Sequence, residues 1–302
     1  MRRRALLLGG LLAPLAACAT DISARPPAVR TPPAPVPFGD LETRYDGRVG
    51  IFAASIGSGA TVEHRADERF AFCSTFKTLA AAAVLARYPL SHLSSRVTFT
   101  RDAIRSISPI TQDHVDSGMT IGELCDAAIR FSDGTAGNLL LDDIGGPRAL
   151  TEYLRNLGDP VSRMDNYEPE LNRDTPDSVF DTTTARAIAA DYRAILGVGP
   201  GVTGARLEAI PSADKQQLLL NWLRDNKTGA HRIRAAAPPG WTVADKTGTG
   251  DYGRANDVAI AFPPTGAPLV IAILADRNGG YDAPPSEEFV AAAAGRIFDA
   301  LR

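Results

Sequence analysis

The sequence has few of the residues that cross-link a fold or bind metal ions. Only 3 cysteines and 4 histidines occur among 302 residues, and the histidines stand singly at positions 64, 92, 114 and 231. The Cys and His spacings of a zinc site are missing from the sequence. Beyond the N-terminal region, Cys73 and Cys125 fall at the start of one helical segment and inside another, which predicts buried free thiols. We therefore expect no metal, no other cofactor and no disulfide.

Basic clusters and long apolar runs are missing from most of the chain. The formal net charge is −3, and no basic run follows the first few residues, so a nucleic-acid partner is not expected. No apolar stretch after residue 20 is long enough to span a bilayer. The length and a hydrophobic content of 44% fit one large globular domain or two smaller ones. A monomer is the default expectation.

Lysine is scarce in a chain that is rich in arginine. Four lysines, at positions 77, 215, 227 and 246, stand against 28 arginines. Arginine does not deprotonate in proteins, whereas a lysine amine can titrate and presents a compact charge. A lysine retained at a buried position therefore indicates a role that arginine cannot fill. Chance placement of each lysine is the alternative.

The first 18 residues have the pattern of an export signal. Arginines at positions 2–4 precede an apolar segment from Ala5 to Leu15, which ends in Leu15-Ala16-Ala17-Cys18. This string also has the form of a bacterial lipobox, which predicts lipidation of Cys18 and an extracytoplasmic protein anchored to the cell membrane, with some release. A plain secretory signal with a chance cysteine is the alternative. Sec and twin-arginine export both stay open.

The rest of the chain divides into a proline-rich segment and a folded part. We interpret residues 19–39, with six prolines, as a stiff tether, although terminal disorder is compatible with the same composition. Residues 49–55 and 61–66 flank Gly57-Ser58-Gly59 and predict a hairpin, and further strands are predicted over 241–248, 256–262 and 268–276. Residues from 72 to about 222 have a helical pattern, and a last helix is predicted over 286–301.

These elements predict an α/β (α+β) fold. The strands at the two ends join through short turns, so they should form one five-stranded antiparallel sheet with packed helices, built from residues 40–72 and 213–302. Residues 73–212 would form an inserted all-helical domain. The junction between two such domains favours a cleft.

A Ser-x-x-Lys string occurs twice. Ser212-Ala213-Asp214-Lys215 follows a proline and precedes a helix, so we interpret Ser212 as an N-cap and Lys215 as exposed. Ser74-Thr75-Phe76-Lys77 instead opens a helix that is apolar on nearly all sides, which predicts burial. Lys77 lies one turn beyond Ser74 on the same face. Because a hydroxyl is a weak acid, a neighbouring base of this kind can activate Ser74 as a nucleophile.

A Lys-Thr-Gly string also occurs twice. Lys227-Thr228-Gly229 follows a helix and is interpreted as its C-terminal cap. Lys246-Thr247-Gly248 ends an alternating strand, where glycine lets a ligand approach the strand edge and lysine and threonine can bind a carboxylate. The second copy is therefore the functional candidate.

Two further strings are weaker when taken alone. Ser132-Asp133-Gly134 lies between two helical patterns, and an ordinary turn with a capping serine explains it equally well. Glu168 and Asn172 lie four residues apart in a long loop, where a carboxylate and an amide could hold one water. A charged surface loop is the alternative for this segment.

Taken together, these strings resemble the motif set of the class A β-lactamases in order and rough spacing. The resemblance runs from about residue 40 to 302 and is strongest to actinobacterial chromosomal members. Those members are indicated by Cys73-Ser74-Thr75-Phe76-Lys77, Arg232-Ile233-Arg234-Ala235 and Gly250-Asp251-Tyr252-Gly253. The resemblance implies the two-domain serine β-lactamase/transpeptidase-like fold. It also implies hydrolysis of the β-lactam amide of penicillins and cephalosporins through a serine acyl-enzyme, which confers β-lactam resistance.

The resemblance also assigns roles to single residues. It implies that Ser74 is the nucleophile, that Ser132 passes a proton to the leaving nitrogen, and that Glu168 with Asn172 activates the deacylating water. The backbone N–H groups of Ser74 and Thr249 would form the oxyanion hole. Whether Lys77 or Glu168 accepts the proton in acylation stays open. The implied substrate-binding residues are Ile107, Gly134, Arg232, Lys246, Thr247, Gly248 and Thr249.

Three departures from the family pattern affect expectations about the substrate. Gly134 stands where most members have asparagine, which predicts a roomier cleft and an altered substrate and inhibitor profile. Ala255 stands where many members have an arginine, and Arg232 resembles the arginine that other members use instead. Some relatives have cysteine pairs of which this chain lacks one member each, because Gly250 stands in place of one cysteine and Ala81 in place of another.

Two other functions share part of this pattern. A penicillin-binding D,D-peptidase shares Ser-x-x-Lys and Lys-Thr-Gly but lacks the Glu–Asn loop, so it stays acylated. A non-catalytic lipoprotein that senses β-lactams is the second alternative. Access around Ile107, Gly134 and Gly250 decides the ranking of penicillins, cephalosporins and carbapenems.

Overall fold

A five-stranded antiparallel sheet forms the centre of the molecule. The computed structural model describes residues 36–105 and 107–302. The strands are β1 (Gly47–Ser55), β2 (Thr61–His64), β7 (Thr242–Gly250), β8 (Arg254–Phe262) and β9 (Leu269–Arg277), in the order β2-β1-β9-β8-β7. β1 pairs β9 along its whole length, from Gly47 opposite Arg277 to Ser55 opposite Leu269. The predicted sheet, which joins the two ends of the sequence, is therefore confirmed.

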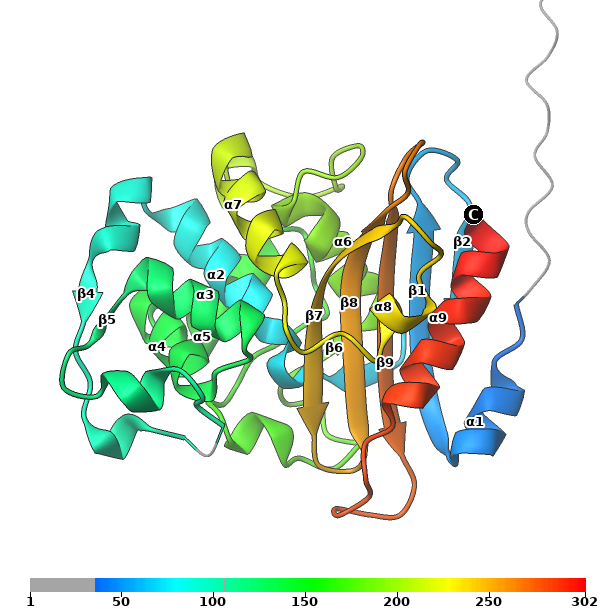
Figure 1. Cartoon of the computed structure of the whole chain (residues 1–302), viewed down its shortest axis with the longest axis horizontal. Coiled ribbons are helices and arrows are strands. Elements are labelled where there is room, and N and C mark those ends of the chain that lie inside the picture. Colours follow the sequence, from blue (N-terminus) through cyan, green and yellow to red (C-terminus); the bar gives the residue numbers. More distant parts are fainter. Residues whose placement is uncertain (1–35, 106) are drawn as a thin grey trace, which may run out of the picture. The chain divides into compact units, whose positions relative to one another are not determined.

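Helices cover both faces of this sheet (Figure 1). α1 (Gly39–Tyr45), α8 (Ile233–Ala236) and α9 (Glu287–Leu301) cover one face. The opposite side holds α2 (Phe76–Arg87), α3 (Ile121–Arg130), α4 (Gly134–Ile144), α5 (Pro147–Asn156), α6 (Ala185–Ile195) and α7 (Ala213–Arg224). Alternate side chains of β9 point to opposite cores, with Ile271 and Ile273 on the α9 side and Val270 and Leu274 on the other. Burial on both faces explains why this strand is apolar throughout.

α2 lies at the centre of the helical layer. Every residue from Phe76 to Leu85 is buried, Lys77 included, as a helix that is apolar on nearly all sides predicts. It is preceded by the 3₁₀ turn η1 (Cys73–Thr75), and the other 3₁₀ turns are η2 (Leu90–Ser94), η3 (Arg101–Ala103), η4 (Thr111–His114), η5 (Glu170–Asn172) and η6 (Leu207–Ala209).

The predicted all-helical segment is not purely helical. It contains β4 (Arg96–Val97) paired with β5 (Met119–Thr120), and β6 (Thr182–Thr184) paired with β3 (Arg69–Ala71). α6 from this segment packs against β1 and β9 of the sheet. Its hydrophobic residues extend the core on that face of the sheet. The described residues form one compact unit, and the domain boundaries at residues 73 and 212 stay predictions.

The folded part begins before the predicted limit at residue 40. Phe38, assigned to the tether, is 1% exposed and packs in the core beneath α9, and α1 starts at Gly39. An aromatic side chain buried there contributes to the core, so the tether cannot extend to residue 39. The predicted signal peptide, Cys18 and most of the tether lie outside the described residues. Among the described helices, none combines the length and apolar character needed to cross a bilayer.

Candidate active site

Ser74 lies in the turn that leads into α2, and Lys77 lies in the first turn of that helix. The Lys77 ammonium donates to Ser74 Oγ over 2.8 Å, and the Lys77 side chain is 0% exposed. The preceding residue, Cys73, has a backbone φ of 45°, a conformation that residues other than glycine rarely adopt. Such strained positions cluster at functional sites, where surrounding contacts hold them in place.

Ser132 meets both buried lysines from the start of α4. Its carbonyl oxygen accepts from Lys77 over 2.8 Å, and its hydroxyl oxygen accepts from Lys246 over 3.0 Å. Ser132 also has a positive φ, 58°. The capping interpretation of Ser132 is wrong, because Asp133 caps α4 by accepting from the Ala136 N–H over 2.9 Å. The serine hydroxyl is thereby free to contact the lysine.

Glu168 completes the cluster around Ser74. Its Oε1 accepts from Ser74 Oγ over 3.0 Å and lies 2.8 Å from Lys77 Nζ. The carboxylate is buried, as is Lys77, so charge pairing and hydrogen bonding stabilise both groups out of water. Asn138 on α4 fixes the backbone of Glu168, since its amide group accepts from the Glu168 N–H and donates to the Glu168 carbonyl, both over 2.9 Å.

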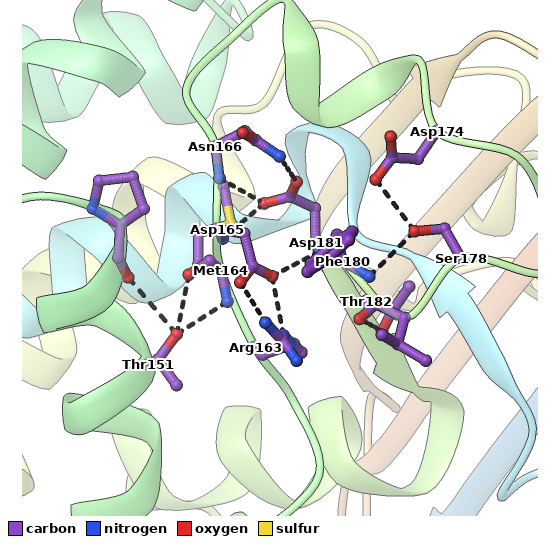
Figure 2. Close-up of polar contacts among 12 residues, drawn as sticks. Thr151, Arg163, Met164, Asp165, Asn166, Asp174, Ser178, Phe180, Asp181 and Thr182 are labelled. Atoms are coloured by element: carbon purple, nitrogen blue, oxygen red, sulfur yellow. Dashed lines mark hydrogen bonds and ion pairs between the residues drawn. The ribbon is translucent and has the colours of Figure 1, made fainter.

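The loop that carries Glu168 is closed by polar contacts at its base, which Figure 2 shows. Asp181 accepts from the N–H groups of Asp165 and Asn166 over 2.8 and 2.9 Å and from the Asn166 side chain over 2.7 Å. Arg163 forms an ion pair with Asp165. Burial raises the pKa of Asp181, against the opposing effect of these hydrogen bonds. These contacts hold the loop against the rest of the fold, which a charged surface loop, the alternative interpretation, would not require.

Asn172, in η5, lies four residues beyond Glu168. Its backbone carbonyl accepts from Arg254 over 2.8 Å, which fixes its position. Its side-chain Oδ1 is buried and has no hydrogen-bond partner among the described residues. A buried amide oxygen of this kind is suited to accept from a water. The role assigned to Asn172 stays a prediction that this placement favours.

β7 is an edge strand and lies beside η1. Lys246 is fully buried, and its ammonium donates to Ser132 Oγ and, over 2.7 Å, to the Thr247 carbonyl. Burial lowers the pKa of Lys246 well below its usual range, and the nearby charge of Lys77 lowers it further. A Cβ at Gly248 would lie 3.0 Å from Cys73 Cβ and 3.2 Å from Ser74 N, so the close approach of β7 to the serine requires glycine.

Arg232 lies beside the far end of β7. Its guanidinium donates to the Gly248 and Asn256 carbonyls and to Thr249 Oγ1, each over 2.7 Å, and it pairs with Glu287 over 3.1 Å. Thr249 is exposed and is opposite Ala255 in the sheet register. The structure thus places Arg232 next to the predicted carboxylate-binding residues. Its contact with a substrate stays a prediction.

Gly134 and Ile107 lie at the opposite side of the site. A Cβ at Gly134 would lie 2.6 Å from Glu168 Oε2 and 3.0 Å from the Ile107 carbonyl. The space around this Cα is therefore taken by the Glu168 carboxylate, and glycine serves its close approach. Ile107 is 66% exposed and follows position 106, which is not described.

The two duplicate strings differ sharply from the functional copies. Lys215 is half-buried and donates to the Tyr88 carbonyl, and Lys227 is exposed. Ser212 is the N-cap residue of α7, as predicted, but its hydroxyl bonds to Asp214 and makes no capping hydrogen bond. The predicted cap at 227–229 is wrong, because α7 ends at Arg224 with Asp225 as its C-cap.

Sequence reasoning missed two residues near the site. Thr228, from the copy set aside, has its Oγ1 2.5 Å from Thr247 Oγ1. Asn138, which holds Glu168, lies inside a helical pattern that carries no signal for such a role. An asparagine on an otherwise apolar helix face is the one sequence feature that could have indicated a buried polar contact. The predicted burial of Cys73 and Cys125 as free thiols is confirmed.

A buried serine that contacts a lysine and a glutamate, beside an edge strand with a second buried lysine, defines a serine acyl-transfer enzyme. Comparisons with known proteins agree. The model of the beta-lactamase enzyme family matches residues 38–301. A beta-lactamase of Mycobacterium tuberculosis is 53% identical over 302 residues, covering 97% of this chain and 95% of the relative.

Solved structures extend the likeness to the fold. A beta-lactamase from Desulfarculus baarsii is 45% identical with a TM-score of 0.81, covering 87% of this chain and 94% of that chain. A class A beta-lactamase from Clostridium kluyveri is 44% identical with a TM-score of 0.80, covering 87% and 96%. The chain belongs to the beta-lactamase enzyme family, as a class A member of the actinobacterial type that the sequence motifs predicted.

Proposed function

We propose that this enzyme hydrolyses the amide bond of β-lactam antibiotics through an acyl-enzyme on Ser74. The observation that carries the proposal is the placement of Glu168 within 3.0 Å of Ser74 Oγ, with Lys77 bonded to both groups. A nucleophile and two bases within hydrogen-bond reach satisfy the geometric requirement for proton transfer. Family membership and the named relatives support the same activity.

In acylation, Ser74 Oγ attacks the lactam carbonyl carbon and gives its proton to Lys77 or Glu168. The backbone N–H groups of Ser74 and Thr249 are proposed to stabilise the oxyanion, because η1 and β7 lie side by side there. The C–N bond then breaks and the leaving nitrogen takes a proton from the Ser132 hydroxyl. The contact of that hydroxyl with Lys246, and of its carbonyl with Lys77, supports this relay.

In deacylation, Glu168 takes a proton from a water that attacks the ester, and Ser74 is released. Asn172 Oδ1, which has no hydrogen-bond partner within residues 36–105 and 107–302, supports a role in holding that water. Lys246, Thr247, Thr249 and Arg232 are proposed to bind the substrate carboxylate, since two cationic groups and two hydroxyls lie along this end of β7. Gly248 permits the approach, and Ile107 and Gly134 border the acylamino side.

The decisive experiment compares two glutamates of one loop. Glu168→Ala should accumulate a stable penicilloyl adduct on Ser74, seen by intact-protein mass spectrometry, because the general base for deacylation is gone. Glu170→Ala is the matched control, since Glu170 is exposed and two residues away, and it should turn over penicillin as the wild type does. Rapid turnover by Glu168→Ala would remove Glu168 from deacylation.

The same experiment separates the enzyme from its two alternatives. A D,D-peptidase would give a long-lived adduct even with the wild-type chain, and a non-catalytic sensor would give no hydrolysis by either variant. The buried Glu168, held by Asn138 against Ser74, favours turnover over both alternatives. We expect wild-type protein to hydrolyse penicillin without a persistent adduct.

We also propose that the enzyme is exported and held at the membrane by a lipid on Cys18, as a monomer. The support is the Leu15-Ala16-Ala17-Cys18 string after an apolar segment. Wild-type protein made in an actinobacterial host should partition into the detergent phase on Triton X-114 extraction, and Cys18→Ser should partition into the aqueous phase. Aqueous partitioning of a wild type with an unmodified Cys18 would favour the plain secretory signal.

A further inference from the structure

A second threonine contacts the hydroxyl of Thr247, one of the residues proposed to bind the substrate carboxylate. Thr228 Oγ1 lies 2.5 Å from Thr247 Oγ1, and either hydroxyl could be the donor in this pair. Thr247 is 3% exposed and Thr228 is half-buried, so protein groups rather than bulk water set the direction of the hydrogen bond. Thr228 has no part in the proposed mechanism, and its other bonds show how it acts on Thr247.

The neighbours of Thr228 fix the direction of this hydrogen bond. Asn226 Nδ2 donates to Asp245 Oδ2 over 2.6 Å, and Asn226 Oδ1 accepts from the Thr228 N–H over 3.0 Å. A backbone N–H can only donate, so turning the Asn226 amide round would place two donors against each other. Asn226 Oδ1 is therefore an acceptor, and the Thr228 hydroxyl donates to it over 2.8 Å.

Each hydroxyl has a single proton to donate. Thr228 directs its proton to Asn226, so the proton between the two threonines has to come from Thr247. The donors therefore run in one direction, from Thr247 through Thr228 and Asn226 to Asp245. In this arrangement the Thr247 oxygen offers a ligand only lone pairs. A carboxylate also offers only lone pairs, so it cannot bond to Thr247 unless the chain of donors changes direction.

Thr249, two residues further along β7, has the opposite arrangement. Its Oγ1 accepts from the Arg232 guanidinium over 2.7 Å, and because a guanidinium only donates, this bond leaves the Thr249 proton available to a ligand. Lys246 has three N–H groups and donates to Ser132 Oγ and to the Thr247 carbonyl, which leaves one for a ligand. Thr249 and Lys246 can thus bind a carboxylate without rearrangement, whereas Thr247 cannot.

We propose that Thr228 is a positioning residue, which holds the Thr247 proton away from the substrate carboxylate in the unliganded enzyme. This inference rests on the proposed function, since it takes the carboxylate of a β-lactam as the ligand of Thr247. On binding, the Thr247 O–H rotates toward the carboxylate, and the Thr228 O–H rotates from Asn226 Oδ1 to Thr247 Oγ1. No proton changes its oxygen, and Asn226 Oδ1 keeps the Thr228 N–H.

This rotation lowers the affinity for a carboxylate by the worth of one neutral hydrogen bond. Asn226, which is 3% exposed, loses the Thr228 hydroxyl as a donor, while the contact between the two threonines persists with its direction exchanged. Without the Thr228 hydroxyl, the Thr247 proton can point to an incoming carboxylate from the start. Affinity should then rise about threefold to tenfold, the usual range for one such bond. A purely structural role for Thr228 predicts the opposite sign, because disturbing Thr247 would weaken binding.

The test measures the Kd of benzylpenicillin by isothermal titration calorimetry on protein that carries Ser74→Ala and cannot be acylated. Turnover by the wild-type enzyme is a separate measurement, so failure of the proposed hydrolysis is distinguishable from failure of this inference. Adding Thr228→Ala should lower the Kd about threefold to tenfold. Thr228→Ser keeps the hydroxyl and should leave the Kd within about twofold of the parent value.

A double-mutant cycle shows whether the effect passes through Thr247. In protein that also carries Thr247→Ala, Thr228→Ala should not change the Kd, because the hydroxyl that it would release is absent. An unchanged or raised Kd in Thr228→Ala, the same gain without the Thr247 hydroxyl, or no saturation of the Ser74→Ala parent up to about 10 mM benzylpenicillin would each overturn the proposal.

Neutron diffraction of the wild-type protein in deuterated water tests the direction of the bonds without any variant, so it stays decisive even if a variant misfolds. In the unliganded protein, the Thr247 deuteron should lie toward Thr228 Oγ1 and the Thr228 deuteron toward Asn226 Oδ1. A Thr247 deuteron that points away from Thr228 would overturn the proposal, because Thr247 would then be ready to donate to a carboxylate.

Discussion

The two Ser-x-x-Lys segments of this chain are a natural comparison, since each lies at the start of a helix of 12 residues. At α2 the serine and lysine are buried, and Glu168, Ser132 and strand β7 pack around them. At α7 the serine is exposed and its hydroxyl bonds to the neighbouring Asp214. The same four-residue string thus becomes a nucleophile with its base or an ordinary helix start. The surrounding elements decide which, because only they exclude water and bring a carboxylate.

The two Lys-Thr-Gly copies make the same point less cleanly. Lys246 is buried in β7 and Lys227 is exposed, so the lysines separate completely. The threonines do not separate, because Thr228 lies against Thr247. Asn226, next to it, donates to Asp245 over 2.6 Å, immediately before Lys246. The segment Lys227-Thr228-Gly229, which the sequence analysis interpreted as a helix cap, therefore helps to support the functional Lys246-Thr247-Gly248 segment.

The largest expected effect is on kcat, when Ser74 and Ser212 are each replaced by alanine in separate variants. Ser74→Ala should reduce kcat for a penicillin by about 10⁶-fold, since the acyl-enzyme can no longer form. Ser212→Ala should change kcat less than twofold. Steady-state hydrolysis measured by the loss of lactam absorbance provides both values, and mass spectrometry should detect no adduct on Ser74→Ala. Comparable losses in both variants would mean that the contrast between the two segments is false.

The next largest difference in kcat/KM is expected between variants of Lys77 and Lys215, the lysines of the two Ser-x-x-Lys segments. Lys77→Met removes a hydrogen-bond donor and a base at Ser74, and we expect kcat/KM to fall by roughly 10²–10⁴-fold. Lys215→Met removes only a contact with a backbone carbonyl, and activity should stay within twofold. Circular dichroism checks that both variants fold. If Lys77→Met kept wild-type kcat/KM, Glu168 alone would serve as the base at Ser74.

The sheet and the buried helix could be predicted because each follows from a local pattern. The apolar run from Leu79 to Leu85 in α2 reports its own burial directly. The alternation in β7 predicted a strand, but the strand is buried at every position from Val243 to Gly248. The scarcity of lysine did not by itself identify the buried ones, because Lys215 is half-buried and Lys227 is exposed. The neighbouring pattern of each string was needed to select Lys77 and Lys246, which are buried.

What could not be predicted depends on contacts between distant segments. Phe38 was assigned to the tether because proline surrounds it, and its burial depends on segments distant in sequence, including β2, where its ring contacts His64, and α9. Asn138 and Thr228 act on residues 30 and 19 positions away, respectively, and no short motif records such pairs. The sequence also does not state which of Ser132 and Asp133 caps α4; the structure shows that Asp133 accepts from the Ala136 N–H.

The pH dependence of activity distinguishes the two Lys-Thr-Gly copies. Because burial lowers the pKa of Lys246, its ammonium loses its proton at a lower pH than the ordinary lysine value of about 10.4. The positive charge that attracts the substrate carboxylate is then lost, so kcat/KM should fall at alkaline pH, by up to about tenfold per pH unit. Lys246→Arg cannot lose its charge and should move this decline upward. Lys227→Arg should keep the wild-type profile, and an unmoved decline in Lys246→Arg would exclude Lys246 as its source.

The variant with the smallest expected effect on activity probes the distance between β7 and the turn that leads into α2. The proposed mechanism requires this approach at the Ser74 copy and has no equivalent at the Ser212 copy. A Cβ at Gly250 would lie 2.9 Å from Cys73 Sγ, close to the spacing of a carbon from the second sulfur of a disulfide. Gly250→Cys should therefore form a bond to Cys73 on oxidation, seen by non-reducing peptide mapping. We expect stabilisation of about 2–4 kcal/mol, lost on reduction, and kcat/KM within tenfold of wild type. The double variant Cys73→Ser with Gly250→Cys should show neither the cross-link nor the stabilisation. Free thiols at both positions after full oxidation would show that β7 lies farther from Ser74 than the site requires.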